Sequence, residues 1–421
     1  MSFDWEYSTL GAVCSTQGGA IQTGPFGSQL HTSDYKEIGI PVVMPTNIGE
    51  GGIVEDGIAR IGQTDVERLA QHKLRLGDIV FSRRGDVTKN ALVREHEVGW
   101  LCGTGCLKVR LGDESIANAK FVSYSLRLPD TKDWLVRHAV GATMPNLNTG
   151  ILSAVPILLP PLRAQKQIAD FLGALDDRIT LLRETNATLE AIAQALFKSW
   201  FVDFDPVRAK MEGCAPEGMD EATAALFPDS FEETELGAVP RGWPIGRLDD
   251  LLVLQRGFDL PSQDRTPGTY PIIAASGPCG THYEAMVKGP GVVTGRSGVL
   301  GRVFLEFEDH WPLNTTLWVK EFRAATPCFA YELLRLLDFK SFNAGSAVPT
   351  LNRNHIHGLP YVVPARACVA AFESISRPLH QRVKDNDAQA QTLATLRDTL
   401  LPRLISGQLR LLEAQAELEA A

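Results

Sequence analysis

Disulfide spacing, membrane spans and catalytic signatures are all missing from this sequence of 421 residues. Its seven cysteines are odd in number and irregularly spaced, which favours buried, reduced thiols over a disulfide framework. No segment reaches the ~18 uninterrupted apolar residues of a membrane span. The first ten residues contain Asp4 and Glu6 but no cationic, apolar run, so no signal peptide is expected. These absences predict a cytoplasmic, globular protein.

Motifs that would indicate an enzyme are also absent. The sequence has no Gly-x-x-x-x-Gly-Lys-Ser/Thr phosphate loop, no Gly-x-Gly-x-x-Gly, no His-Glu-x-x-His and no Gly-x-Ser-x-Gly. Asp176 and Asp177 are paired carboxylates, but neighbours on a helix point about 100° apart and cannot jointly flank a substrate bond. A solvated helix surface or a partner contact is the better interpretation of this pair. No catalytic residue is predicted.

Two clusters of side chains that can ligate metals give only weak evidence for a metal site. Cys102 and Cys106 lie near His96, but no second pair of ligands closes a four-coordinate site. His355 and His357 would place both imidazoles on one side of a strand, where a hydrogen-bonded structural role is favoured over metal binding. No metal site is predicted.

The net charge of −9 does not exclude a nucleic-acid partner, because the acidity is confined to one part of the chain. Residues 161–236 contain 7 Lys and Arg against 15 Asp and Glu, a net charge of −8. Residues 1–160 (15 against 17) and 237–360 (12 against 11) are nearly neutral. Both can present local basic faces to phosphates, so charge permits DNA binding without proving it.

The two nearly neutral regions are copies of one unit. Residues 142–152 (ATMPNLNTGIL) align with residues 346–356 (SAVPTLNRNHI) at an offset of 204, and the alignment continues without a gap for roughly fifty residues. Upstream, residues 77–85 parallel residues 290–298 at a different offset, as expected for strands joined by unequal loops. Each copy has a strand-rich part with many Gly and Pro, followed by a long helix. The chain is therefore a duplicated α+β unit.

The helices have marked boundaries. The first is expected between Pro160-Pro161 and Asp205-Pro206, and the second from about Arg366 to a break at Pro402. Residues 211–240 are rich in Glu, Asp, Pro and Ala and predict an exposed linker with one short helix near its middle, at residues 220–226. An Ala/Glu/Leu tail, residues 409–421, is expected to be helical.

Apolar residues recur every seven positions along both helices. In the first, one row is Ile168, Leu175, Leu182, Leu189 and Leu196, and the other is Leu172, Ile179, Asn186, Ala193 and Trp200. The second helix has Phe372, Leu379, Asn386, Leu393 and Leu400. This spacing predicts that the two helices pack lengthwise on each other. Asn186 and Asn386 either lie in the seam and set its register or face solvent.

Polar, basic and turn-forming residues occur at equivalent places in the two copies. Arg can form bidentate hydrogen bonds with guanine and Asn with adenine, and both side chains can also hold phosphates. Ordinary surface turns or helix caps are the alternative interpretation of each residue. The candidate DNA-binding residues are Ser82, Arg83, Arg84, Lys89, Asn90, Asn146 and Asn148 in the first copy, and Arg296, Ser297, Arg302, Asn352, Arg353 and Asn354 in the second.

Three stretches resemble the specificity (S) subunit of type I restriction-modification systems. The most specific runs from Leu159-Pro160-Pro161-Leu162-Arg163-Ala164-Gln165-Lys166-Gln167-Ile168-Ala169 through to Lys198-Ser199-Trp200-Phe201-Val202-Asp203-Phe204-Asp205-Pro206-Val207, and looks like the central conserved region of that family. Residues 396–407 (LRDTLLPRLISG) are similar to its distal conserved region, and residues 236–243 (LGAVPRGW) to the start of its second recognition domain. The resemblance covers nearly the whole chain.

The resemblance implies an α+β architecture in which two mixed α/β target-recognition domains are separated by two long antiparallel, coiled-coil-like helices with pseudo-twofold symmetry. The expected boundaries are residues 1–158 and 237–362 for the recognition domains, 159–205 for the central helix, 206–236 for a linker, and 363–421 for the distal helix and tail. Residues 365–368 (ARAC) depart from the Pro-Leu-Arg-Ala of the first copy, which leaves the start of the second helix open.

The same resemblance implies a function and partners. Each recognition domain would read one half of a bipartite DNA site, and the helices would set the unread gap between the halves. Two methyltransferase subunits would dock on the helical regions and restriction subunits would join them. S-adenosylmethionine, ATP and Mg²⁺ would be used by those partners, while this chain would hold no cofactor. Two alternatives are a duplicated enzyme with its active site between the halves, and a scaffold or inhibitor that binds a methyltransferase without reading DNA.

Overall fold

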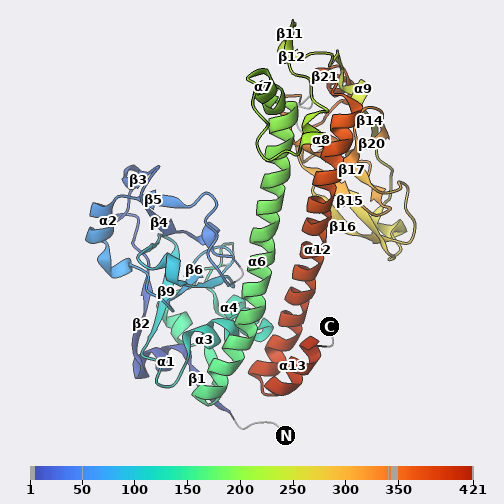
Figure 1. The fold of residues 1–421 in the computed structure, drawn as a ribbon. Coiled ribbons are helices and arrows are strands. Elements are labelled where there is room, and N and C mark those ends of the chain that lie inside the picture. Colours follow the sequence, from blue (N-terminus) through green and yellow to red (C-terminus); the bar gives the residue numbers. More distant parts are fainter. Residues whose placement is uncertain (1–4, 50, 142, 340, 343–348, 420–421) are drawn as a thin grey trace. The chain divides into compact units, whose positions relative to one another are not determined.

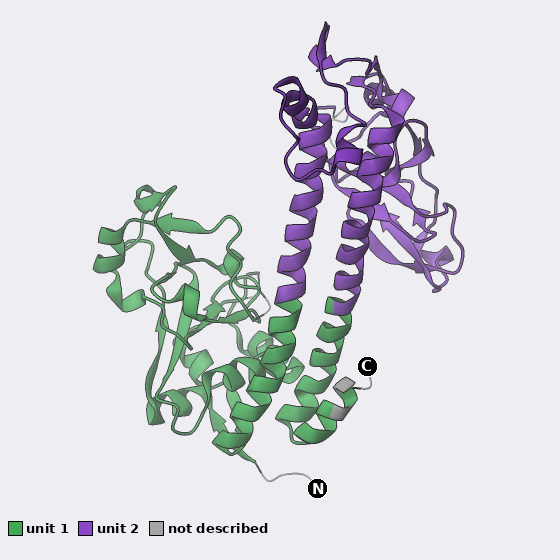
Figure 2. Cartoon of the chain, in the orientation of Figure 1, with its two compact units in different colours: residues 1–180, 390–421 green, residues 181–389 purple. Residues whose placement is uncertain are grey.

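The computed structural model describes residues 5–49, 51–141, 143–339, 341–342 and 349–419. The chain forms two compact units, residues 1–180 with 390–421 and residues 181–389 (Figure 2). Ala142 and residues 346–348 of the repeated segments lie outside the described residues. Two helices of 40 residues, α6 (Leu162–Phe201) and α12 (Arg366–Ile405), each contribute to both units (Figures 1 and 2).

The first unit is built mainly of strands. Its elements in chain order are β1 (Glu6–Thr9), α1 (Leu10–Thr16), β2 (Gly18–Thr23), β3 (Tyr35–Lys36), β4 (Ile40–Val43), β5 (Ala59–Ile61), α2 (Gln63–Arg68), β6 (Ile79–Ser82), β7 (Asn90–Leu92), β8 (Leu101–Cys102), β9 (Cys106–Gly112), α3 (Ala119–Ser125), α4 (Pro129–His138), α5 (Thr149–Ser153) and β10 (Pro156–Leu159). The C-terminal helix α13 (Leu411–Glu419) also belongs to this unit. Short 3-10 helices lie at Thr32–Asp34, Pro45–Asn47, Ala70–His72 and Glu95–Glu97.

The second unit has corresponding elements. They are α7 (Asp205–Met211), α8 (Glu221–Ala224), β11 (Phe231–Thr234), β12 (Gly237–Pro240), β13 (Ile245–Arg247), α9 (Leu248–Leu251), β14 (Leu252–Arg256), β15 (Tyr270–Ala274), β16 (Gly277–His282), β17 (Gly291–Gly295), β18 (Val303–Glu306), β19 (Trp311–Pro312), β20 (Thr316–Phe322), α10 (Pro327–Leu336), α11 (Arg353–His357) and β21 (Pro360–Val362). A 3-10 helix lies at Ser262–Asp264.

The main sheets of the two units have the same topology, while the second sheet has four strands in the first unit and three in the second. A four-stranded antiparallel sheet has the order β2-β9-β6-β7 in the first unit and β14-β20-β17-β18 in the second. A second sheet contains one parallel pair, β4 with β8 or β15 with β19, and a two-stranded sheet joins β1 to β10 or β13 to β21. The predicted equivalence of residues 77–85 and 290–298 is confirmed, because β6 and β17 occupy the same place in the order.

Each unit closes its core with part of both long helices. In the first unit Ile168, Leu172, Leu400 and Leu404 pack with the sheet and with α3. In the second unit the core is aromatic: the ring centroid of Phe197 lies 5.0 Å from that of Phe329 and 5.6 Å from that of Phe372. Burial of these apolar faces is what holds helices of this length in place. Within each unit the paired segments run antiparallel.

The helix boundaries are predicted well at three of four ends. The first helix begins just after Pro160-Pro161 and ends before Phe204, whose φ of 57° breaks the helical conformation. The second begins at Arg366 as expected, but the predicted break at Pro402 is wrong, since α12 continues to Ile405. Leu400, Leu401, Leu404 and Ile405 are all buried, and that burial outweighs the one helical hydrogen bond that proline removes.

The linker is more ordered than predicted. A short helix, α8, lies where residues 220–226 predict one, with the Asp220 side chain accepting a hydrogen bond from the Thr223 N–H at 2.9 Å. However, the same stretch also contains α7, the β11–β12 hairpin and the buried Phe227, which packs on Trp200. The acidic segment is therefore partly a structural component of the second unit. The tail is helical as predicted, and Arg403 forms an ion pair with Glu417 of α13 at 3.0 Å.

Within the described ranges, every helix lacks the length or the apolar character that crossing a bilayer requires.

Candidate nucleic-acid interface

In the first unit the structure joins two of the predicted polar loops. The backbone oxygen of Arg83, just after β6, accepts a hydrogen bond from the Leu147 N–H at 2.9 Å, and Arg84 pairs with Asn146 as an antiparallel bridge. The Arg83 Nε also donates to the Asn146 Oδ1 at 3.3 Å. Gly85, with a φ of 79°, closes the turn. An arginine and an amide more than sixty residues apart thus share one edge of the unit.

The second unit repeats this arrangement. The backbone oxygen of Arg296, just after β17, accepts from the Leu351 N–H at 2.9 Å, and Ser297 pairs with Thr350 as an antiparallel bridge. The Arg296 side chain differs from that of Arg83, because its Nη1 lies 3.5 Å from the backbone oxygen of Asn314. The duplicated backbone pairing shows that the two predicted loops are equivalent in structure as well as in sequence.

Two of the predicted contact residues cap helices. Asn148 and Asn352 are the N-caps of α5 and α11, and their Oδ1 atoms accept from the Ile151 N–H at 2.8 Å and the Asn354 N–H at 3.0 Å. The capping interpretation is therefore correct for both.

Burial removes Ser82 and Asn90 from the open surface, since each is only 2% exposed. The Ser82 hydroxyl donates to the Arg84 backbone oxygen at 2.8 Å, and Asn90 lines a cavity.

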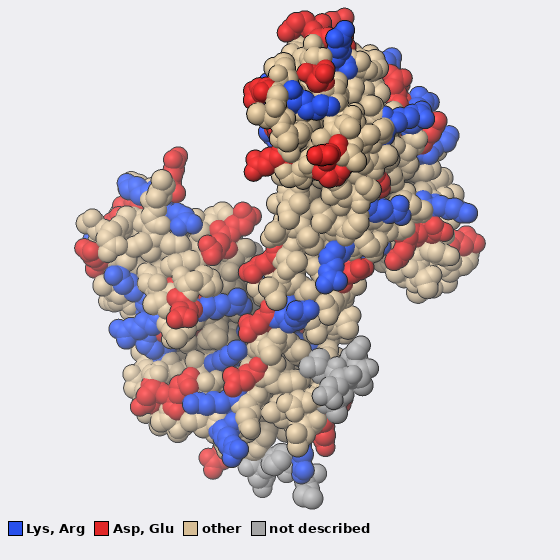
Figure 3. All heavy atoms as spheres, in the orientation of Figure 1, with Lys and Arg blue, Asp and Glu red and all other residues tan. Residues whose placement is uncertain are grey.

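Five of the other candidates are exposed: Arg84, Lys89, Arg302, Arg353 and Asn354. Among contacts within the described ranges, only Arg302 of these five has a side-chain hydrogen bond, to the Ser276 backbone oxygen at 2.7 Å. On the face of the first unit seen in Figure 3, Lys and Arg are interspersed with Asp and Glu, without one large basic patch. Surface charge alone would therefore not locate a DNA contact on this face.

The two asparagines lie in the seam between the long helices. Asn186 is buried, and its Nδ2 donates to the Val383 backbone oxygen at 3.0 Å and to Asp387 at 2.8 Å. Its Oδ1 accepts from the Nδ2 of Asn386, also buried, at 2.8 Å. Of the two predicted orientations, the one inside the seam is confirmed. A polar pair in an apolar seam fixes the register, because any slip would leave both amides buried without partners.

The predicted heptad rows are not buried to the same extent. Ile168, Leu172, Leu175, Ile179 and Leu182 are buried, as are Phe372 and Leu400. Leu189, Leu196, Leu379 and Leu393 are half-buried. The row through Leu172, Ile179, Asn186, Ala193 and Trp200 is buried at every position, so this row forms the seam of α6.

A buried ion cluster, which the sequence does not predict, attaches α3 to both long helices in the first unit. Asp176 of α6 accepts from the Tyr124 hydroxyl at 2.6 Å, from Arg127 at 3.3 Å and from Arg397 of α12 at 2.6 Å. Burial opposes ionisation, but the hydrogen bonds from Tyr124 and Arg397 hold the pKa of the Asp176 carboxyl below its ordinary value. The expectation of a solvated or partner-facing surface is wrong for Asp176; its neighbour Asp177 is exposed.

The second unit has a related cluster at the corresponding place. Glu332 of α10 is 1% exposed and lies 3.2 Å from the Nε2 of His380 on α12 and 3.4 Å from Arg335. Arg335 also pairs with Glu190 of α6 at 3.5 Å. Both clusters carry a tyrosine beneath the arginine, Tyr124 or Tyr331, with the guanidinium carbon 4.5 Å or 5.1 Å from the ring centroid.

The histidine and cysteine clusters do not form metal sites. His355 and His357 lie on helix α11, which contradicts the predicted strand. The Nε2 of His357 accepts from the Leu254 N–H at 2.9 Å, in line with the structural role, and burial lowers the pKa of its imidazole. Cys102 and Cys106 are buried thiols, and burial raises the pKa of Cys102 to about 12. Among the described residues no group of three or more His, Cys, Asp or Glu could hold a metal ion.

Comparison with known proteins agrees with the duplicated architecture. Residues 3–191 match the family model described as type I restriction modification DNA specificity domain. The chain is 23% identical over 415 residues to the type I restriction enzyme HindI specificity subunit of Haemophilus influenzae, covering 82% of this chain and 89% of that protein. It is 23% identical over 321 residues to the MjaIX specificity subunit of Methanocaldococcus jannaschii, covering 70% of each chain.

A solved structure extends the likeness to the fold. The crystal structure of the type I restriction-modification S subunit from M. genitalium superposes with a TM-score of 0.58 at 17% identity, covering 95% of this chain and 96% of that one. This likeness agrees with the predicted α+β class, which has two mixed domains and long helices. Over most of its length the chain is thus similar to type I restriction-modification specificity subunits, and its residues 3–191 match the specificity-domain model of that family.

Proposed function

We propose that this chain is the non-catalytic DNA-reading subunit of a type I restriction-modification complex, and that each unit reads one half of a bipartite DNA site. The observation that supports this proposal most strongly is the duplicated loop pairing. In each unit an arginine, Arg83 or Arg296, follows the central strand and is tied by its backbone oxygen to the second polar loop. Loops positioned by a rigid sheet are suitable platforms for contacts with base edges in the major groove.

The long helices set the gap between the half-sites in this proposal. Because α6 and α12 contribute residues to both units, the proposal assigns the length of the gap to the register between these two helices. The Asn186–Asn386 pair is the device that holds this register. Two methyltransferase subunits dock on the helical regions, and restriction subunits join that core. S-adenosylmethionine, ATP and Mg²⁺ are bound by those partners.

The test is to co-express the chain with a methyltransferase encoded beside it and to map N6-methyladenine across the host genome by single-molecule sequencing. The expected result is a split motif whose two specified halves flank a gap of constant length, and the motif should disappear when this chain is deleted. Methylation that is unchanged without the chain would favour the alternative of a scaffold or inhibitor that does not read DNA. Methylation by the isolated chain would favour a duplicated enzyme.

The spacing role has a separate test. Inserting one heptad after Leu182, with a matching heptad in α12, preserves the seven-residue pattern and lengthens both helices by about 10 Å at ~1.5 Å per residue. We expect a longer unread gap with both half-sites unchanged. If the original gap is retained in the methylation map, the helices do not set it.

A further inference from the structure

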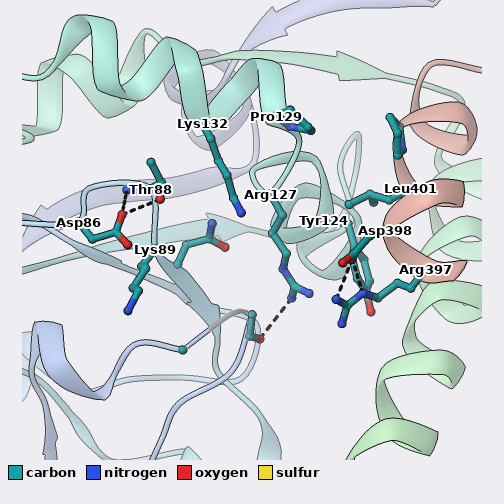
Figure 4. Close-up of a pocket in the computed structure, with 14 residues that line it drawn as sticks. Asp86, Thr88, Lys89, Tyr124, Arg127, Pro129, Lys132, Arg397, Asp398 and Leu401 are labelled. Atoms are coloured by element: carbon teal, nitrogen blue, oxygen red, sulfur yellow. Dashed lines mark hydrogen bonds and ion pairs between the residues drawn. The ribbon is translucent and has the colours of Figure 1, made fainter. Parts of the chain in front are cut away.

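A cavity of about 270 Å³ in the first unit lies beside the candidate recognition loop. Its walls come from the turn between β6 and β7, the segments around α3 and α4, and the last turns of α12. Figure 4 shows the side chains of Lys132, Arg127 and Arg397 directed toward the same space from three different elements. The charged residues that line it are Lys89, Lys132, Arg127, Arg397, Asp86 and Asp398.

The acidic side chains around the cavity are already engaged, whereas two of the cations are not. Asp86 accepts from the Thr88 hydroxyl at 2.6 Å, and Asp398 accepts from the Arg397 Nε at 2.8 Å. In the described part of the chain, the ammonium groups of Lys89 and Lys132 have neither an ion pair nor a hydrogen bond. The cavity therefore has positive charge available for an anion.

Two buried polar groups in the cavity wall have no partner. Asn90 is 2% exposed, and its Oδ1 is unsatisfied within the described residues. The Nε of Arg127 is buried and equally without an acceptor there, although its other nitrogens bond to Gly51 and Asp176. Buried groups of this kind are uncommon in folded proteins unless a ligand completes them. Rotation of the Asn90 amide would present its Nδ2 as a donor beside the Arg127 Nε.

The position of Arg127 is fixed by its surroundings. Gly51 has a φ of 83°, and a Cβ there would lie 2.0 Å from the guanidinium carbon of Arg127. The Gly51 N–H donates to the backbone oxygen of Asn90 at 3.2 Å, which ties this loop to the start of β7. Arg127 and Asn90 are thus held in one wall of the cavity before any ligand arrives.

We propose that this cavity binds a phosphate of the DNA backbone, with Lys89 and Lys132 as the direct ligands and with Arg127 and Asn90 as donors in the wall. The inference rests on the proposed DNA-reading function and assigns a place to the backbone contact. Arg83, which donates a hydrogen bond to Asn146, lies at the other end of the same loop as Lys89. A phosphate held here fixes the register of the duplex, while the neighbouring side chains read the bases.

A cavity beside the joint of the second unit has different chemistry. It has a volume of about 300 Å³ and lies against β18 and α10, the counterparts of β7 and α3. Its charged lining is Glu190, Glu306, Asp387, Lys384 and His380, and its lysine is paired with Glu306 at 3.4 Å. Three carboxylates repel a phosphate, so the proposal does not extend to this cavity.

The experiment measures DNA binding by the full chain in complex with its methyltransferase subunit as a function of NaCl concentration. The duplexes contain either the site from the methylation map or a scrambled sequence. The variants are Lys89→Ala, Lys132→Ala, their combination and Lys132→Glu, with Lys36→Ala as the control because Lys36 is an exposed lysine of the same unit that lies outside the cavity and away from the long helices. Thermal unfolding should change little, because neither cavity lysine has a side-chain hydrogen bond or ion pair in the described part of the chain.

Removal of both lysines should make the plot of log affinity against log salt less steep by about 1.8, or about 0.9 for each contact. Affinity should fall on both duplexes alike, Lys132→Glu should lose more than Lys132→Ala, and the methylated motif should keep both half-sites. An unchanged salt slope in the double variant overturns the proposed phosphate site while leaving the proposed function intact. A changed half-site overturns it as well, since the lysines would then read bases. Failure of the unaltered complex to bind either duplex would instead refute the DNA-reading function.

Discussion

The clusters that attach each domain to the long helices have the same arrangement, but the carboxylate comes from the helix in one unit and from the domain in the other. In the first unit the helix supplies the carboxylate, Asp176, and the domain supplies Arg127. In the second unit the domain supplies the carboxylate, Glu332, and the residue on the helix is His380, which lies 204 positions after Asp176. A tyrosine stacked under an arginine is common to both. Duplication has preserved a polar joint at this place, while the carboxylate has moved from the helix to the domain.

The cavities beside the two joints also differ in the charged residues that line them. One carboxylate shared by two guanidinium groups leaves cations available in the first cavity. In the second, Glu190 and Glu306 add acidity around Lys384, and burial raises the pKa of the Glu306 carboxyl despite that lysine. Two domains with one topology can therefore present different electrostatic surfaces to the same polymer. Fold similarity between the units does not imply that they contact DNA in the same way.

The largest effect is expected from Asp176→Asn. The substitution leaves Arg127 and Arg397 without their shared carboxylate in a mostly buried site, and removal of one partner of such a pair costs about 3–5 kcal/mol. Hydrogen exchange should show weaker protection of α3 and little change in α10. Glu332→Gln should produce the reverse pattern. Asp177→Asn, one residue away and exposed, is the control and should have almost no effect. Equal loss of protection in both units after either substitution would show that the joints are not independent.

The pH dependence of the same variant tests the charge state of Asp176. Its pKa is lower in the folded protein than in the unfolded chain, so its contribution is complete above the unfolded value and is lost as pH falls through the folded one. The stability difference between the unaltered protein and Asp176→Asn should be constant from about pH 5 to 8 and should shrink below about pH 4. Chemical denaturation at several pH values measures this. A difference that changes between pH 6 and 8 would implicate another group.

A smaller effect is expected from the asparagine pair in the seam. Asn186→Leu removes three hydrogen bonds and leaves the amide of Asn386 buried without its partner, which costs about 1–3 kcal/mol. Asn386→Leu should cost less, because Asn186 keeps its bonds to Val383 and Asp387. The double Leu variant should recover much of the stability and broaden the unread gap in the methylation map, since register is no longer specified. A double-mutant cycle by urea unfolding would show no coupling if the pair were unimportant.

Features that depend on spacing along the chain could be predicted from the sequence. The heptad rows, the prolines at Pro160-Pro161 and the offset of 204 led to the two long helices and to the duplicated topology. These signals are local or periodic, and the burial of an apolar face reproduces them in three dimensions. The Asn186–Asn386 contact was one of two open interpretations, and the choice between them required the packed helices.

Features that depend on distant partners could not be predicted in this way. Asp176 meets Arg397 across 221 positions, and nothing near either residue marks the other. Ser82 and Asn90 look like loop residues in sequence. In the structure Ser82 ends β6 and Asn90 begins β7, and both side chains are buried. Pro402 looks like a helix stop in sequence. In the structure α12 continues to Ile405, because burial of four apolar residues around Pro402 stabilises its last turn. In each case tertiary packing outweighed a local signal.

The smallest effect is expected from the two N-caps, and it separates capping from base reading. Asn148→Ala and Asn352→Ala should each cost about 1 kcal/mol, because each loses the hydrogen bond to the first turn of α5 or α11. Asp in place of Asn should restore that stability, since a carboxylate also caps a helix, whereas it cannot donate a hydrogen bond to adenine. If both asparagines only cap, Asn148→Asp and Asn352→Asp will keep the stability and the methylated motif of the unaltered chain. A motif altered at one half-site by the Asp variant, with stability retained, would show that the asparagine of that unit also reads DNA, and would make the two units unlike in recognition as well as in charge.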